Sequence, residues 1–187
     1  MHARCRRWIA NILRAHSSLV ALAVRQRAKF EGWLKLELAE CARKRGARSV
    51  QVEPQLGKGK GRADVSFAFG KLRYNVELKT VNTNWEVPGV ESKTRPITMN
   101  IASVIEGARK LRTGPGRGIV AFVLFPVPTG DNRWWVYVER IARSLRVRLS
   151  QSSHCARVGV RLGGGDSCDL VVCCFPYPGG ARDETEN

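Results

Sequence analysis

The order of apolar and turn-forming segments along the 187-residue chain predicts one mixed α/β domain. Two amphipathic helical segments come first, followed by three short segments with the composition and spacing of strands. A helix, a continuous apolar strand, a second helix and a pair of strands complete the chain. No internal repeat or linker divides the sequence, so we expect a single core.

The first quarter of the chain is predicted to be helical. Residues 1–26 are expected to form one amphipathic helix, because apolar side chains recur there every three or four positions. A second helix should run from Arg27 to Arg45, since Gly46 is a typical residue at a helix end. The apolar stripe of this second helix consists of Phe30, Trp33, Leu34, Leu38 and Cys41.

The middle of the chain is predicted to supply the strands. Strands are expected at Ser49–Glu53, Arg62–Phe69 and Leu72–Lys79, the last two forming a hairpin that turns at Gly70–Lys71. A glycine- and lysine-rich loop, 55–61, precedes the hairpin, and a long loop, 81–96, follows it.

The remainder is predicted to alternate helices and strands. A helix is expected over about Asn100–Arg112, with Thr98 or Asn100 as its cap. The run Ile119–Val127 is nearly all apolar, as in a central strand that is buried on both faces. A helix capped by Asp131 or Asn132, two strands at 157–162 and 169–175, and an acidic tail at 181–187 should follow.

The charge balance indicates a polyanionic partner. Lysine and arginine total 32 against 16 acidic residues, which gives a formal net charge of +16 and favours nucleic acid, with DNA preferred to RNA. A basic surface without a specific partner is the alternative. No apolar run is long enough to span a bilayer, and the acid-free first 30 residues resemble a transit peptide in composition, although we prefer an amphipathic helix.

The spacing of the six cysteines is not typical of a disulfide framework. We therefore expect reduced thiols and an intracellular, cytoplasmic protein (in the nucleoid, or in the nucleus of a eukaryote). A zinc site built from His154 and the nearby cysteines is the weaker alternative, because paired C-x-x-C spacing is missing and Cys173 and Cys174 lie in an apolar strand.

Three polar residues on the predicted hairpin carry the chemistry. Asp64 and Glu77 stand at equal distances from the turn at Gly70–Lys71, so antiparallel pairing should place them opposite each other. Side chains alternate along a strand, so Glu77 and Lys79 should share one face.

Two carboxylates that lie close together repel each other unless a cation joins them. Mg²⁺ prefers oxygen ligands, can stabilise charge on a phosphate and can activate a water molecule for hydrolysis. The amine of Lys79 can orient or deprotonate that water and neutralise the phosphate. Because an acid and a lysine two positions apart are often merely solvated, the motif alone is a weak signal; its strand-turn-strand context strengthens it.

Glu37 is a candidate fourth member of this group. It falls within the apolar stripe of the second helix, where an unpaired acid is costly. A metal ion or a lysine would supply a partner. The alternative is a carboxylate at the stripe edge that reaches solvent, and Glu31 and Glu40 are weaker candidates because they lie nearer the polar side.

The run from Glu37 to Val127 resembles the PD-(D/E)XK, or restriction endonuclease-like, superfamily. The segments ELKTVNTNW and RPITMN also resemble those of an uncharacterised subgroup, while Ala63 stands where the motif has proline. The resemblance implies a core of helix, three strands, helix and strand within residues 27–180. It also implies Mg²⁺ or Mn²⁺ held by Asp64, Glu77 and Glu37, a catalytic Lys79 acting with these acids, and allows a homodimer.

Residues beside this motif are candidates for binding nucleic acid. Basic side chains precede Asp64, and polar residues with one aromatic follow Lys79, so both groups could contact phosphates or an unstacked base. The alternatives are a solvated loop and a tryptophan that only packs the chain. The candidates are Lys58, Lys60, Arg62, Thr80, Asn82, Asn84 and Trp85.

Three classes of function follow from these observations. A metal-dependent nuclease that hydrolyses phosphodiester bonds is favoured. An inactive nucleic-acid-binding module with the same fold is the main alternative. A membrane-surface or scaffold protein that uses the basic N-terminal helix would account for the charge but not for the carboxylates on the strands.

Overall fold

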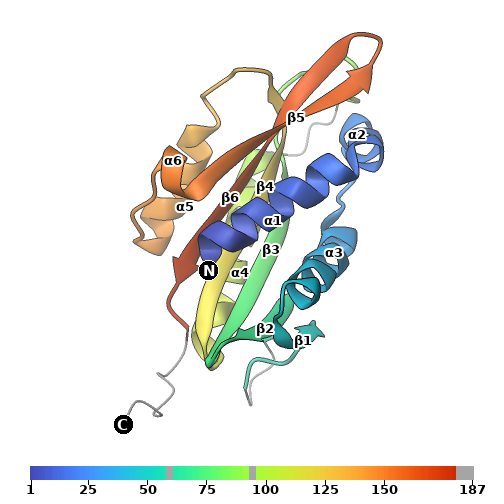
Figure 1. Ribbon diagram of the computed structural model, residues 1–187. Coiled ribbons are helices and arrows are strands. Elements are labelled where there is room, and N and C mark those ends of the chain that lie inside the picture. The colour runs from blue at the N-terminus through green and yellow to red at the C-terminus, as the bar shows by residue number, and fades with distance from the viewer. Residues whose placement is uncertain (58–60, 93–95, 180–187) are drawn as a thin grey trace.

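A computed structural model describes residues 1–57, 61–92 and 96–179 of the chain. Its centre is a six-stranded mixed sheet in the order β1-β2-β3-β4-β6-β5 (Figure 1). Only β3 and β4 pair in parallel among these neighbours, and the other pairs are antiparallel. The strands are β1 (Arg48–Val52), β2 (Val65–Phe69), β3 (Leu72–Asn82), β4 (Arg117–Pro128), β5 (Cys155–Gly163) and β6 (Asp166–Tyr177).

Helices cover both faces of the sheet (Figure 1). On one face lie α1 (His2–Ala15), α2 (Ser17–Arg25) and α3 (Glu31–Lys44). On the other lie α4 (Ile97–Lys110), the short 3-10 helix η1 (Leu111–Thr113) and α5 (Trp135–Leu145), with α6 (Gln151–His154) leading into β5. The predicted α/β class is thus confirmed as a six-stranded mixed sheet flanked by helices.

Alternation along β3 divides its side chains between the two faces. Val76 and Leu78 pack in the core beneath α1–α3, whereas Val81 joins the core beneath α4 and α5. In contrast, β4 is buried on both faces over nearly its whole length, as its apolar sequence predicted. The strand that carries Glu77 and Lys79 therefore lies between its hairpin partner β2 and the buried strand β4.

Several predicted boundaries were wrong. Residues 1–26 form two helices that meet at His16, because Ser17 and Ser18 favour a helix start over a helix interior. The second predicted helix begins at Glu31 and not at Arg27. Along the hairpin, β2 begins at Val65 while β3 continues to Asn82, which leaves part of β3 without a β2 partner.

The helix predicted over Asn100–Arg112 also lies earlier than expected. It begins at Ile97 after Pro96, so neither Thr98 nor Asn100 is its cap. Asn100 is instead buried inside the helix, where its side-chain amide donates to the Asn82 carbonyl oxygen at 3.0 Å. This contact ties α4 to the end of β3.

All six cysteines are free, as predicted, and Cys173 and Cys174 are fully buried in β6 as small core residues. Within the part of the chain that the structure describes, no helix is long and apolar enough to cross a membrane. The predicted acidic tail lies outside the described residues.

Candidate active site

The hairpin places Asp64 opposite Glu77. Val65 pairs with Val76 and Phe69 with Leu72, and one step further along this register Asp64 faces Glu77. The Asp64 amide continues the ladder by donating to the Val76 carbonyl oxygen at 2.9 Å. The predicted register is therefore confirmed, although Asp64 itself lies just before β2 and not inside it.

Two carboxylates bind the edge of β3 that has no β2 partner, beyond the Val65–Val76 pair. The Leu78 amide donates to Asp64 Oδ2 at 2.7 Å, and the Thr80 amide donates to Glu31 Oε2 at 3.1 Å. Alternate amides of a strand point to the same side, so both face the position that a longer β2 would have filled. The late start of β2, at Val65, thus creates a place where acids from α3 and from the hairpin are fixed by backbone N–H groups.

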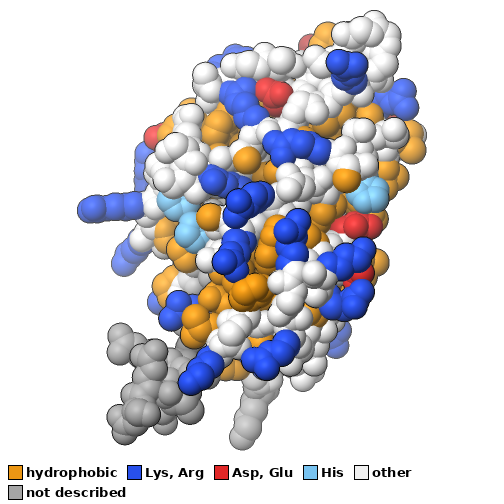
Figure 2. Space-filling view, viewed as in Figure 1, with side chains coloured by type: hydrophobic (Ala, Val, Ile, Leu, Met, Phe, Trp, Pro, Cys, Tyr) orange, Lys and Arg blue, Asp and Glu red, His pale blue; other side chains and the backbone are white. Residues whose placement is uncertain are grey.

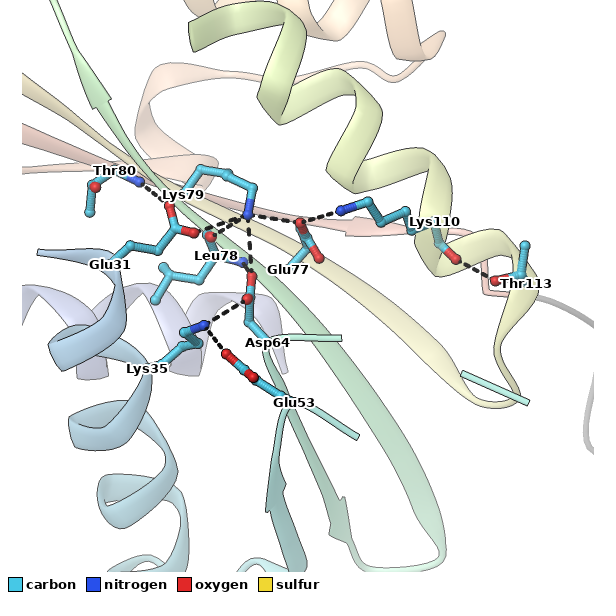
Figure 3. A network of polar contacts seen from close by, with 10 residues as sticks. All are labelled: Glu31, Lys35, Glu53, Asp64, Glu77, Leu78, Lys79, Thr80, Lys110 and Thr113. Atoms are coloured by element: carbon cyan, nitrogen blue, oxygen red, sulfur yellow. Dashed lines mark hydrogen bonds and ion pairs between the residues drawn. The ribbon is translucent and has the colours of Figure 1, made fainter. Parts of the chain in front are cut away.

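The Lys79 ammonium lies at the centre of these acids (Figure 3). Its Nζ atom is 3.0 Å from Glu77 Oε1, 3.1 Å from Glu31 Oε1 and 3.6 Å from Asp64 Oδ2. The same ammonium donates to the Leu78 carbonyl oxygen at 3.2 Å. Four oxygen atoms therefore converge on one positive charge.

Two further lysines surround this group. Lys35 Nζ of α3 lies 2.6 Å from Glu53 Oε1 and 3.4 Å from Asp64 Oδ1. Lys110 Nζ, at the end of α4, lies 3.8 Å from Glu77 Oε1. The four acids and three lysines together are called the carboxylate cluster below; its members are Glu31, Glu53, Asp64, Glu77, Lys35, Lys79 and Lys110.

The carboxylate cluster opens into a pocket of about 330 Å³. Asp64, Glu77 and Lys79 line it together with Glu53 and Lys110, and so does Arg62. Acids outnumber bases in the cluster, four to three, in a chain where bases outnumber acids by 32 to 16. Arg62, which also lines the pocket, brings the bases to four, so the charges of the four carboxylates are balanced by the protein's own cations.

Burial and charge shift the proton affinities in the cluster. Burial, followed by the negative charge of Asp64, raises the pKa of the Glu77 carboxyl, which is only 2% exposed. Burial would lower the pKa of Lys79, but the negative charges of Asp64, Glu77 and Glu31 outweigh it and leave that pKa raised. Both groups therefore hold protons more tightly than usual, Glu77 chiefly because it is buried and Lys79 because acids surround it.

We expect the Glu77→Gln variant to gain stability relative to the wild type as the pH rises above 4.5, the ordinary pKa of a glutamate. Because the folded protein binds the Glu77 proton more tightly than the unfolded chain, stability falls with rising pH until folded Glu77 is ionised. Urea unfolding of both proteins in EDTA between pH 4 and pH 8 measures the difference. A difference that is constant over this range would contradict the raised pKa.

The prediction for Glu37 is not supported by the geometry. Its Oε2 atom lies 3.7 Å from His16 Nε2, at the side of α3 that faces the N-terminal helices. Glu31 and Lys35, four positions apart, share the face that turns toward the hairpin, whereas Glu37 is about 200° around the helix from Lys35. The structure therefore brings Glu31, and not Glu37, to Asp64, Glu77 and Lys79.

The residues after Lys79 have mixed roles. Thr80 is buried, and the Asn82 side-chain amide donates to the Arg27 carbonyl oxygen at 2.8 Å, so both shape the chain here. Asn84 is exposed. Trp85 is half-buried, packs against the ring of Tyr137 at a centroid distance of 5.2 Å and lies under the guanidinium of Arg133.

The residues before Asp64 are only partly placed. Arg62 is exposed, lines the pocket and belongs to a short bridge with Gln55. Lys58 and Lys60 lie outside the described residues.

Arg27 holds the loop that follows β3. Its side chain is 4% exposed and donates to three backbone carbonyl oxygens, those of Thr83 at 2.6 Å, Trp85 at 2.6 Å and Glu91 at 2.5 Å. Each of the three guanidinium nitrogens donates to a different carbonyl, whereas all three N–H donors of a lysine radiate from one atom and cannot reach acceptors that lie this far apart. Arg27 thus fixes the backbone on both sides of Asn84, close after the catalytic candidate Lys79.

The Arg27→Lys substitution should destabilise the protein by roughly 2 to 4 kcal/mol, because buried carbonyl groups lose their donors. Urea unfolding measures this loss, and hydrogen exchange should rise first in residues 83–91. The exposed Arg25→Lys substitution is the control and should change little. Equal stability of the two variants would show that Arg27 does not hold the loop.

Sequence reasoning missed Lys35, Glu53 and Lys110 and ranked Glu31 too low. Glu31 and Lys35 carry a usable signal, because their spacing of four places both on one helix face. Glu53 and Lys110 stand at the ends of β1 and α4, and only the tertiary fold brings them to Asp64 and Glu77.

Comparisons of the chain with protein-family models, with curated proteins and with solved structures found no significant match. A function must therefore be inferred from the residues of the site and their geometry.

Proposed function

We propose that the protein is a metal-dependent nuclease of the PD-(D/E)XK type that hydrolyses phosphodiester bonds, in DNA rather than RNA. The observation that carries this proposal is the convergence of Asp64, Glu77 and Glu31 on Lys79 in an open pocket of a strongly basic protein. The element order α3-β1-β2-β3-α4-β4 supports it, since this is the helix, three strands, helix and strand that the resemblance implies.

The donor set fits a hard divalent cation. The described residues contain no group of three or more His, Cys, Asp or Glu side chains placed to hold a metal ion. Mg²⁺, however, usually binds one or two carboxylates and keeps several waters. Asp64 and Glu77 supply the two carboxylates, and the Leu78 carbonyl oxygen faces the same point, which the Lys79 ammonium occupies. When bound there, the cation would stabilise charge on a phosphate and promote attack by water.

The chain's own groups have separate roles in this proposal. The Leu78 amide holds Asp64 in place, and α4 confines Glu77 from the other side. The acids around Lys79 raise its pKa, so its ammonium carries a positive charge that would neutralise the phosphate and the charge that develops in the transition state. Glu31 keeps Lys79 at the pocket by accepting its hydrogen bond.

An inactive nucleic-acid-binding module is the second candidate. The basic composition and the exposed Arg62 would serve it equally well. It gives no reason, however, for four acids to gather where a phosphate backbone would approach, because they would repel that backbone unless a cation were present.

The proposal is tested by incubating the protein with single-stranded, duplex and branched DNA and RNA, with Mg²⁺ or Mn²⁺. We expect cleavage by the wild type and none by Asp64→Ala. The control is Glu37→Ala, which removes an acid of α3 that lies away from the cluster and should cleave as the wild type does. Equal cleavage by Asp64→Ala would exclude this site.

Divalent cations should also stabilise the fold through the same residues. Mg²⁺ at about 100 times its dissociation constant would add roughly 2.7 kcal/mol to the unfolding free energy of the wild type. The Glu77→Gln variant lacks one ligand charge and should gain much less. Thermal unfolding with and without Mg²⁺ measures both, and equal shifts in the two proteins would place the cation elsewhere.

A further inference from the structure

The exposed side of α1 carries a row of polar side chains. Arg4, Arg7, Asn11 and Arg14 recur at helical spacing and are all exposed, while the opposite side of the helix is buried against the sheet. The view in Figure 2 faces α1 and shows Lys and Arg side chains in a band across this surface. None of this row belongs to the carboxylate cluster.

A groove of about 380 Å³ lies beside this row. It is lined by Arg4, Arg7, Trp8, Asn11, Arg45 and Phe69, which come from α1, the end of α3 and the end of β2. The Arg4 guanidinium lies 5.1 Å from the ring centroid of Phe69, and that of Arg45 lies 5.9 Å from Trp8. Aromatic rings thus orient two guanidinium groups at the groove.

The three arginines of the groove lack acidic partners. Within the described residues, Arg4, Arg7 and Arg45 form no ion pair, and Glu40, the nearest acid on α3, is bound by Arg43 and Lys44. Arg4 and Arg7 stand three positions apart on one helix, where like charges repel. An anion with several negative groups would relieve this repulsion, and phosphate suits the two-pronged guanidinium.

We infer that this groove binds the phosphodiester backbone of duplex DNA at a site separate from the carboxylate cluster. An anionic membrane is a poorer partner, because an amphipathic helix binds a membrane through a free apolar face. The apolar face of α1 is occupied, since Cys5, Ile9 and Leu13 are fully buried in the protein core.

The groove lies at a distance from the carboxylate cluster that favours a long ligand. Glu31 and Arg45 stand at opposite ends of α3, about 20 Å apart at 1.5 Å per residue. Asp64 of the cluster precedes β2 and Phe69 of the groove ends it, so the two are about 17 Å apart at 3.3 Å per residue. The groove is therefore a backbone anchor for a polynucleotide and not a part of the reaction centre.

The test is binding of a fluorescent 24-base-pair DNA duplex in EDTA, at several salt concentrations. The full-length Arg4→Gln/Arg7→Gln/Arg45→Gln variant should bind on the order of 100-fold more weakly at 0.1 M salt. Its plot of log affinity against log salt should be shallower by about 2.7, which is 0.9 for each lost phosphate contact. The control is Arg140→Gln/Arg143→Gln/Arg148→Gln, which removes three exposed charges on and after α5 and should keep most of the slope.

Three outcomes would overturn the inference. The first is unchanged DNA binding by the groove variant. The second is a loss of DNA affinity in the control variant as large as that in the groove variant. The third is a groove variant that loses binding to phosphatidylserine vesicles but still binds DNA. If the triple variant does not fold, Arg7→Gln alone carries the test with an expected slope change of about 0.9. The inference rests on the proposed function for its polynucleotide ligand. Binding is measured in EDTA, which prevents metal-dependent cleavage. The groove can therefore fail to bind DNA in a protein that cleaves it, and the reverse.

Discussion

The Lys79→Ala variant should cleave DNA roughly 10²- to 10³-fold more slowly than the wild type while still binding DNA. The ammonium of Lys79 lies within 3.0–3.6 Å of three carboxylates and lines the pocket. Its loss removes the positive charge that would stabilise the transition state. Single-turnover cleavage and fluorescence anisotropy measure the two effects on the same substrate.

The same substitution should leave divalent-cation binding intact or strengthen it. Lys79 repels a cation that approaches Asp64 and Glu77, so its removal lowers the competition for these acids. Lys71→Ala, in the hairpin turn, loses an equal charge at an exposed position and is the control for both measurements. If Lys79→Ala cleaves as fast as Lys71→Ala, the lysine has no part in the reaction.

The Gly107→Ala substitution should slow cleavage and destabilise the protein by displacing the Glu77 side chain. A methyl group at this position of α4 would lie 2.4 Å from Glu77 Oε1 and 2.9 Å from Glu77 Cδ, closer than atoms can approach. The buried Glu77 carboxylate must therefore move. A displacement of about 1 Å in a catalytic group costs on the order of 100-fold in rate, and forced overpacking costs about 1 to 3 kcal/mol of stability.

Two comparisons isolate this effect. Gly32→Ala in α3 meets nothing within 4 Å, so it should be neutral or stabilise the protein by up to about 1 kcal/mol and leave cleavage unchanged. In a Glu77→Ala background the obstructing side chain is absent, so Gly107→Ala should no longer destabilise the protein. Destabilisation by Gly107→Ala in that background would mean that the clash with Glu77 is not its cause.

The hairpin part of the site was predictable from the sequence because it depends on local rules. A turn at Gly70–Lys71 sets the register that places Asp64 opposite Glu77, and strand alternation places Glu77 and Lys79 together. The buried central strand β4 was equally clear from its apolar composition.

The helical member of the cluster depends on how α3 is rotated against the sheet. Trp33 and Cys41 of the predicted stripe are only partly buried, whereas Ala39 and Ala42 outside it are buried, so the pattern alone misplaced the centre of the stripe. Packing centres it on Leu34 and Leu38, which leaves Glu37 beside His16 and turns Glu31 toward β3. Glu53 and Lys110 join through contacts between distant segments, for which the sequence holds no local signal.

The role of the carboxylate cluster is tested most directly by single-turnover cleavage of labelled duplex DNA as the Mg²⁺ concentration is raised from zero. The wild type should be inactive in EDTA and should reach a saturating rate with Mg²⁺. Asp64→Asn, which keeps the shape of the side chain but removes its charge, should bind the duplex equally well and cleave at none of these concentrations. A folded wild-type protein that binds DNA but cleaves it with neither Mg²⁺ nor Mn²⁺ would contradict the proposed nuclease and favour a binding module.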